Sequence, residues 1–213
     1  MTNFATLQAD IIDWSARDDV SGKIEMFIRA AEPGIFRSVR IMEQETEIAL
    51  SFAGSAYEDD IPTGFVGFKS IRIDNVSNPK AVYVPPQTFH NESQSRDAFE
   101  TLDVDYIYTV ESNKIKLKPA AGATDPVTGA AVYFLKPNGI TSLNTTNVIL
   151  TAHYDVYLWA CLEQLWDWAD EQELSARYHT RLAKSIEEIR LHENERRRPP
   201  GPLVRRMPQR RVR

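Results

Sequence analysis

The chain has 213 residues, of which 42% are hydrophobic and 26% charged, a composition that fits one globular domain, or one core with an insertion, and excludes a disordered or collagen-like chain. A single cysteine excludes a disulfide-stapled scaffold, and no apolar run approaches the ~20 residues of a membrane-spanning helix. The formal net charge of −5 conceals an asymmetry, because residues 196–213 hold eight of the 25 Lys and Arg but no Asp or Glu. Residues 1–195 therefore carry 17 basic against 30 acidic side chains, a net charge of −13.

The amino-terminal part of the chain predicts two helical segments. Apolar side chains recur every three or four positions over residues 4–14, with Asn3 as the N-cap, and again over residues 24–42. Pro33-Gly34 interrupts the second segment, and a proline inside a helix costs about 3 kcal/mol. We therefore expect a kinked helix or two shorter helices there, and the continuous apolar stripe favours the kink.

The first 14 residues also carry two aspartates and no basic start, which is typical of neither a signal peptide nor a transit peptide. Together with the lone cysteine, Cys161, this favours a protein that stays in a reducing cytoplasm during its assembly.

The middle of the chain changes to the period of two that is typical of half-buried strands. The predicted strands cover residues 46–52, 65–73, 81–84, 106–111, 114–118 and 130–135. Ser112-Asn113 predicts a tight hairpin between two of them. Residues 87–99 predict either a short helix or a loop.

Helical spacing returns after residue 147. Two apolar stripes, at residues 154–168 and 174–189, predict two helices that end where the sequence becomes rich in Arg and Pro. The predicted fold is therefore α+β. It consists of a helical bundle built from both ends of the chain (residues 1–44 and 145–195), an inserted antiparallel β module (45–144) and an extended basic tail (196–213).

Five segments, taken in order, resemble the head-to-tail adaptor (connector) proteins of tailed bacteriophages, especially those with short tails. They are the opening helix Asn3-Phe4-Ala5-Thr6-Leu7-Gln8-Ala9-Asp10-Ile11, the pattern Ile24-Glu25-Met26-Phe27-Ile28-Arg29-Ala30-Ala31-Glu32, Ile61-Pro62-Thr63-Gly64-Phe65, the hairpin Glu111-Ser112-Asn113-Lys114-Ile115-Lys116-Leu117 and the helix start Asn147-Val148-Ile149-Leu150-Thr151-Ala152-His153-Tyr154-Asp155-Val156-Tyr157-Leu158. The resemblance covers residues 3–190. Pro33-Gly34 departs from the family, whose second helix is usually continuous.

The resemblance implies structural work in the virion rather than catalysis. Such adaptors form a ring, usually twelve-fold, below the portal ring, where they extend the DNA channel and enclose packaged DNA without reading its sequence. They present a platform to a tail tube or nozzle protein and to tail fibre proteins, and their carboxyl-terminal extensions often reach into the portal. The implied location is the head–tail junction, after assembly in the host cytoplasm, with no cofactor.

The basic tail is the sharpest functional feature of the sequence. Its arginines suit bidentate contacts with carboxylates or phosphates, and the apolar side chains between them favour docking in a protein groove, here that of the portal. The predicted docking residues are Arg196, Arg197, Arg198, Leu203, Val204, Arg205, Arg206, Met207, Arg210, Arg211 and Arg213. Two alternatives stay open, a tail that only aids solubility and a nucleic-acid-binding module.

Aromatic and acidic groups allow further readings. The aromatic side chains Tyr154, Tyr157, Trp159, Trp166 and Trp168 could line a ligand-binding pocket. Packing within and between ring subunits is the favoured interpretation, and it extends to Phe27 and Ile28.

Acidic side chains could form a channel wall that repels DNA, and the candidates are Glu43, Glu45, Glu47, Asp59 and Asp60. An ordinary solvated surface is the favoured interpretation of these residues.

No sequence pattern supports catalysis or metal binding. The chain has no Gly-x-Ser-x-Gly, P-loop or Gly-x-Gly-x-x-Gly motif, and its four histidines do not have the spacing of zinc ligands. Cys161 lies on an apolar face without a basic neighbour, so we expect an unreactive thiol.

Overall fold

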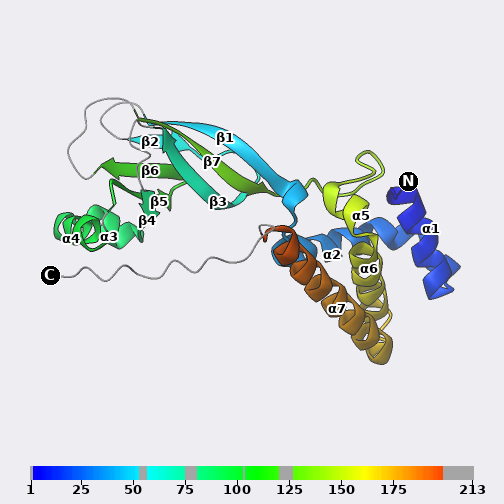
Figure 1. The fold of residues 1–213 in the computed structure, drawn as a ribbon. Coiled ribbons are helices and arrows are strands. Elements are labelled where there is room, and N and C mark those ends of the chain that lie inside the picture. The colour runs from blue at the N-terminus through cyan, green and yellow to red at the C-terminus, as the bar shows by residue number, and fades with distance from the viewer. Residues whose placement is uncertain (1, 53–56, 75–80, 103, 120–126, 199–213) are drawn as a thin grey trace. The chain divides into compact units, whose positions relative to one another are not determined.

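The computed structural model describes residues 2–52, 57–74, 81–102, 104–119 and 127–198 (Figure 1). Its helices are α1 (Phe4–Ser15), α2 (Ile24–Ser38), α3 (Pro86–His90), α4 (Glu92–Leu102), α5 (Val148–Ala152), α6 (Tyr154–Trp168) and α7 (Gln172–Arg196), with 3-10 turns η1 (Asp18–Lys23) and η2 (Met42–Gln44). Its strands are β1 (Glu45–Phe52), β2 (Glu58–Asp60), β3 (Phe65–Asp74), β4 (Ala81–Tyr83), β5 (Tyr106–Glu111), β6 (Lys114–Pro119) and β7 (Val127–Leu135). The predicted α+β class is confirmed.

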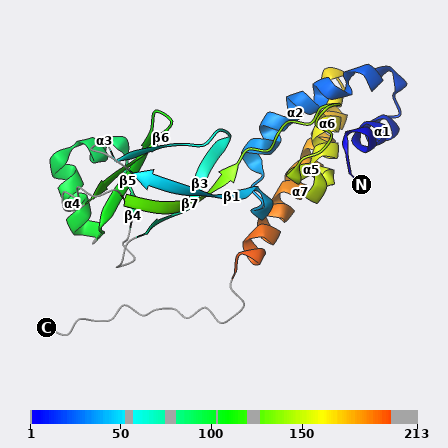
Figure 2. The same ribbon diagram turned by 90° about the horizontal axis from the view of Figure 1, so that it is seen from above.

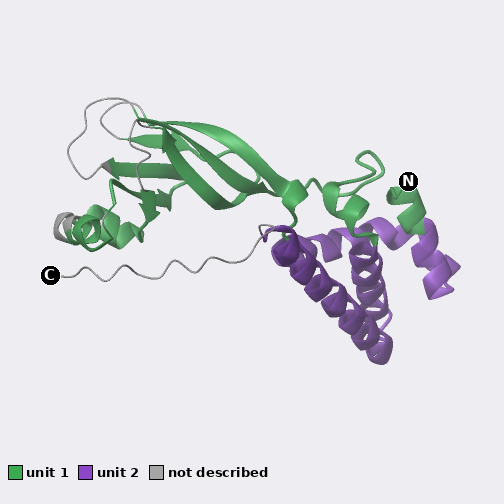
Figure 3. Cartoon of the chain, viewed as in Figure 1, with its two compact units in different colours: residues 1–8, 40–154 green, residues 9–39, 155–213 purple. Residues whose placement is uncertain are grey.

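The chain divides into two compact units (Figure 3). One, here called the sheet unit, comprises residues 1–8 and 40–154, and the other, the helical unit, comprises residues 9–39 and 155–213. The helical unit combines segments from both ends of the chain, so the predicted bundle of amino- and carboxyl-terminal helices is confirmed. Helix α5 and the loop before it belong to the sheet unit by their contacts.

The sheet unit contains a three-stranded sheet in the order β1-β7-β3 and a four-stranded sheet in the order β2-β6-β5-β4. Four of the five pairings between described strands are antiparallel, while β4 and β5 run parallel. The chain between these two parallel strands forms α3 and α4, and Figure 2 shows both helices beside them. A parallel pair needs such a crossover, so the helical alternative for residues 87–99 is correct.

The predicted hairpin between β5 and β6 is confirmed. Glu111 pairs with Lys114, and the two residues between them have positive φ, 50° at Ser112 and 61° at Asn113. Positive φ at both central residues defines the type I′ turn, whose twist matches that of the flanking strands.

One apolar core joins the two sheets. It gathers buried side chains from β1, β3, β5, β6 and β7: Leu50, Phe52, Ile73, Tyr106, Ile115, Leu117, Val127 and Ala131. A smaller cluster around Phe89 and Ile107 packs α3 and α4 against β5. Where β7 meets β3, a Cβ on Gly129 would lie only 2.4 Å from the carbonyl oxygen of Arg72, so only glycine allows this approach of the two backbones.

In the helical unit, α2 runs unbroken through Pro33 to Ser38, so the alternative of two shorter helices is wrong. Pro33 and Gly34 are exposed, while the apolar side chains on the opposite face of the helix, such as Phe27 and Ile28, are buried. Burial of that face outweighs the loss of one backbone hydrogen bond. The helix ends before residue 42 because the backbone becomes extended at Val39 (φ −100°, ψ 128°).

Aromatic contacts connect the helices of this unit. The Trp14 ring on α1 meets Trp159 on α6 edge-on at 5.0 Å, and Trp159 stacks on Tyr178 of α7 at 6.0 Å. Asp170, between α6 and α7, lies in the left-handed region at φ 59°. The ring contacts thus connect the end of α1 with α6 and α7.

Candidate functional site

The carboxyl-terminal end of α7 holds the first arginines of the predicted docking tail. Glu193 is buried, with 2% of its side chain exposed, and its carboxylate accepts a hydrogen bond from Arg196 at 2.7 Å. The Arg197 guanidinium lies 3.7 Å from the other carboxylate oxygen. Both arginines therefore balance a buried charge at the helix end, where cations are also favoured by the helix dipole. Both arginines lie within the predicted tail, but their spacing of three and four residues from Glu193 is the sequence signal of a helical ion pair.

Arg198 is exposed after the helix end. The remaining predicted docking residues lie outside the described part of the chain: Leu203, Val204, Arg205, Arg206, Met207, Arg210, Arg211 and Arg213.

The structure divides the predicted ring-packing residues into two groups. Phe27, Ile28 and Tyr157 are buried within the chain, and the Tyr157 hydroxyl donates to the Glu32 carboxylate at 3.5 Å. The others keep some exposure: Tyr154, Trp159 and Trp166 are half-buried and Trp168 is 43% exposed. Of the predicted residues, only this second group keeps side-chain surface exposed.

Two cation–aromatic clusters lie on the helical unit. The Arg181 guanidinium on α7 sits 4.9 Å from the ring centre of Trp159 and 5.4 Å from that of Tyr178. The Lys23 ammonium lies 3.8 Å from the ring centre of Trp168, with Arg17 at 5.7 Å. Such contacts are worth about 0.5–1 kcal/mol when exposed, and they fix long side chains over the rings. The aromatic rings thus receive cations from their own chain rather than forming an empty ligand box.

A groove between α2, α6 and α7 was not predicted from the sequence. It has a volume of about 350 Å³ and is lined mainly by small and aliphatic side chains: Ala30, Ala31, Gly34, Ile35, Ala160, Leu182, Ala183 and Ile186. At its polar border, His179 Nδ1 lies 2.9 Å from Glu163 Oε1. In the sequence, the spacing of four residues between Ala30 and Gly34 indicates a helix face with small side chains. The other walls come from distant segments, so the groove itself could not be predicted.

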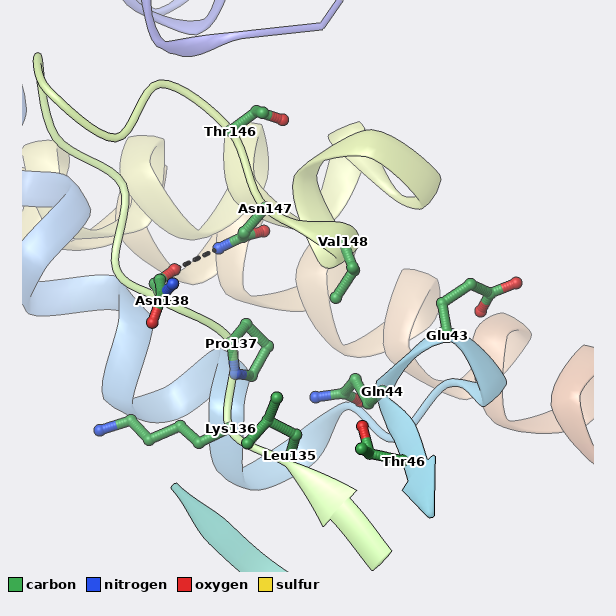
Figure 4. A pocket seen from close by; sticks show the side chains of 10 residues that line it. All are labelled: Glu43, Gln44, Thr46, Leu135, Lys136, Pro137, Asn138, Thr146, Asn147 and Val148. Carbon is green, nitrogen blue, oxygen red and sulfur yellow. Dashed lines mark hydrogen bonds between the residues drawn. The ribbon is translucent and has the colours of Figure 1, made fainter. Parts of the chain in front are cut away.

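A second hollow, of about 210 Å³, lies in the sheet unit where β1 begins and β7 ends (Figure 4). Asn147 builds one wall, because its side-chain oxygen caps α5 at Leu150 N (2.9 Å) while its amide donates to the Asn138 carbonyl at 2.9 Å. Gln44 on the opposite side is buried, and its side-chain oxygen accepts from the Ile41 amide. The side chains of Asn147 and Gln44 thus hold the loop and η2 in place, which favours a structural role for the residues around this hollow.

The loop between β7 and α5 carries an exposed leucine at its tip. Leu143 is 97% exposed, while the neighbouring backbone is held by Thr141 and Asn144. The Thr141 hydroxyl accepts from the Asn144 amide at 3.0 Å, and the Asn144 side chain donates to the Gly139 carbonyl at 2.6 Å. The loop therefore presents one apolar side chain on a backbone that is held by hydrogen bonds.

The acidic residues considered for a channel wall are spread over the sheet unit. Glu45 pairs with Lys69 at 2.6 Å, and Asp59 accepts a hydrogen bond from the Ser51 amide at 2.7 Å. Glu43 and Glu47 are exposed, and Asp60 lies 4.0 Å from Lys114. Two of these carboxylates thus stabilise strands, which agrees with the reading as ordinary surface.

The described residues offer little for catalysis. Burial, with a contribution from Glu32, raises the pKa of the Cys161 thiol far above its ordinary value, so this thiol is not a nucleophile near neutral pH. Two histidines, His90 and His179, each contact a glutamate at 2.9 Å. Within the described ranges, no three His, Cys, Asp or Glu residues gather as metal ligands would.

Among the described helices, none combines the length and apolar character needed to cross a bilayer. The sequence matches none of the curated proteins compared with it. It does match the family model described as SU10 adaptor protein, over residues 2–206. This match runs through both units and into the basic tail, and the chain therefore belongs to the SU10 adaptor protein family of phage head-to-tail adaptors.

Proposed function

We propose that the chain assembles as a ring below the portal ring of a phage head, extends the DNA channel and gives tail proteins a platform. The observation that carries this proposal is the adaptor-family match over residues 2–206. The proposed ring, usually twelve-fold in such adaptors, forms in the host cytoplasm. Its inter-subunit contacts use the exposed aromatic surface of the helical unit, with Trp168 the most accessible of the predicted residues.

The carboxyl-terminal tail docks on the portal in this proposal. Arg196 and Arg197 are tied to Glu193, so the tail leaves from a fixed helix end. Beyond it, five arginines alternate with apolar side chains over residues 199–213. Guanidinium groups form bidentate hydrogen bonds with carboxylates, while Leu203, Val204 and Met207 supply apolar anchors. Because this segment finds its docking site only on the portal, it would add the adaptor after the portal is in place.

The sheet unit meets the next tail proteins, which are a tube or nozzle protein and fibre proteins. Leu143 on the loop after β7 is its most exposed apolar side chain among the described residues. Replacing it by aspartate should weaken attachment of the next tail component while leaving folding unchanged, since its side chain contributes little buried area.

Purified portal and full-length chain provide the test. Native mass measurement and electron microscopy should show a ring of chains on the portal. Arg205, Arg206, Arg210 and Arg211 changed together to glutamine should weaken portal binding at least tenfold. As a control with the same change in charge, the exposed cations Arg29, Arg177, Lys184 and Arg190 of the helical unit are changed to glutamine, and portal binding should be retained.

Two results would overturn the proposal. One is a chain that never assembles on the portal. The other is DNA binding that falls steeply with salt and is lost in the tail variant, without any portal binding, because several released phosphate contacts give a steep log–log salt slope. That second result would instead identify a nucleic-acid-binding module.

A further inference from the structure

The groove between α2, α6 and α7 is an apolar surface that the helical unit leaves open. Ala30, Gly34 and Ala183 on its walls are exposed, and Leu182 and Ile186 are half-buried. A Cβ built on Gly34 would meet no atom of the described residues within 4 Å, so these residues leave room above α2. The volume of about 350 Å³ accommodates a short aliphatic segment.

The net charge of the helical unit indicates which kind of segment can bind over this surface. Its residues 9–39 and 155–195 hold sixteen Asp and Glu against eight Lys and Arg, a net charge of −8. Residues 196–213 carry eight arginines and no acid. The tail of the same chain is therefore opposite in charge to the unit from which it leaves, and it brings Leu203, Val204 and Met207 as aliphatic side chains.

The length of the tail also fits. An α-helix rises 1.5 Å per residue, so Ile186 and Leu182 lie about 15 Å and 21 Å along α7 before Arg196. An extended chain covers ~3.3 Å per residue, so Leu203 can lie up to about 23 Å, and Met207 up to about 36 Å, from the helix end. A tail that turns back along α7 thus brings its apolar side chains to the groove.

We propose that, in the free subunit, residues 203–207 of the tail occupy the α2/α6/α7 groove of the same chain. Leu203, Val204 and Met207 cover the aliphatic walls, and the arginines around them face the acidic surface of the unit. The Glu163–His179 pair lies at the polar border, and Arg37 is directed back onto its own helix by a hydrogen bond to the Pro33 carbonyl at 2.9 Å. The tail is thereby sequestered until a competing partner releases it.

Limited trypsin digestion of the full-length chain tests this contact directly. Trypsin cleaves after Arg205 and Arg206, the positions that the groove would cover. Gly34→Trp fills the groove and should accelerate these cleavages at least tenfold. Gly22→Trp is the matched control, because a Cβ there also meets no atom within 4 Å but Gly22 lies in η1 outside the groove. Equal cleavage rates in the two variants would overturn the proposal.

A cross-linking experiment keeps the proposal testable if Gly34→Trp fails to fold. In dilute full-length protein, the pair Ala183→Cys and Met207→Cys should form a disulfide within one chain, and native Cys161 is buried and does not compete. The control pair uses Glu188→Cys, which is exposed, outside the groove and nearer to the helix end. Equal yields from both pairs, or disulfides formed only between two chains that each carry one of the cysteines, would contradict occupancy by the same chain. Portal is absent from both experiments, so their outcome is separate from that of the proposed docking.

Discussion

The helical unit and the sheet unit bury apolar side chains by different means. In the helical unit, large side chains such as Phe27 and Tyr157 fill the space between helices, supported by ring contacts to neighbouring helices. In the sheet unit, backbones approach closely at Gly129, and ion pairs such as Lys116–Glu111 and Lys69–Glu45 run between strands. The helical unit should therefore be sensitive to lost volume, and the sheet unit to added volume and to acid.

The distribution of tryptophan makes the two units separately observable. All four tryptophans, at positions 14, 159, 166 and 168, belong to the helical unit. Tryptophan fluorescence therefore follows the unfolding of that unit, whereas hydrogen exchange of the strand amides follows the sheet unit.

The largest expected effect is that of Phe27→Ala on the helical unit. Phe27 is 1% exposed and its ring lies 5.8 Å from that of Trp168, so truncation leaves a cavity and should lower the free energy of unfolding by about 3–5 kcal/mol. The denaturant midpoint from tryptophan fluorescence measures it. Met26→Ala, on the exposed face of the same helix, is the control and should shift the midpoint far less. An equal loss in both variants would contradict a core that depends on side-chain volume.

Gly129→Ala should destabilise the sheet unit by about 1–3 kcal/mol, because the new Cβ meets the Arg72 carbonyl of the neighbouring strand. Amide exchange in β3 and β7 should accelerate while tryptophan fluorescence keeps its midpoint. Gly67→Ala on β3 is the matched control, since a Cβ there meets no atom within 4 Å. If Gly67→Ala is equally damaging, the close approach at Gly129 is not what fixes this pair of strands.

A smaller loss, about 1 kcal/mol, is expected for Asn147→Ala, which removes the cap of α5 and the amide contact with Asn138. Because α5 belongs to the sheet unit, exchange of its amides should accelerate without a change in the fluorescence midpoint. Asn147→Asp retains the capping oxygen and should recover most of the loss. A shift of the fluorescence midpoint instead would assign α5 to the helical unit.

The smallest expected effect concerns pH. Hydrogen bonds from Lys116 and His90 lower the pKa of Glu111 below its ordinary value. A lowered folded pKa means that the contribution to stability is complete above the unfolded value of about 4.3 and is lost as pH falls through the folded value. The protection of the strand amides against hydrogen exchange should therefore fall more steeply with acid in the wild type than in Glu111→Gln. Glu100→Gln, at an exposed position on α4, should keep the wild-type response, and an identical response in all three proteins would remove Glu111 from the acid sensitivity of the sheet.

Periodicity predicted the long elements because each has one buried face. The spacing of apolar residues over 154–168 matches α6, and the alternation at Ile48, Leu50 and Phe52 matches β1. The hairpin was predictable because Ser112-Asn113 is a local turn signal. These signals lie within one segment and do not depend on which partner the segment finds.

Features that depend on distant partners were missed. Strand β2 is three acidic residues without an apolar face. Its backbone pairs with β6, where Lys114 lies between the carboxylates of Glu58 and Asp60. Strand β7 begins at Val127, three residues before the predicted start, because Thr128 and Gly129 pair with β1 and β3. The parallel pairing of β4 with β5 and the groove of the helical unit likewise arise only in three dimensions.

The pairing of β1 with β7 also dictates when the protein can fold during synthesis. Glu45 pairs with Phe134, 89 positions later, and Tyr157 reaches Glu32 across 125 positions. Neither unit can close before its late segment has left the ribosome, and contacts of such long range form slowly. The apolar face of α2 is consequently exposed to solvent for most of translation. Synthesis is therefore the stage at which this protein is most prone to aggregation and most dependent on chaperones.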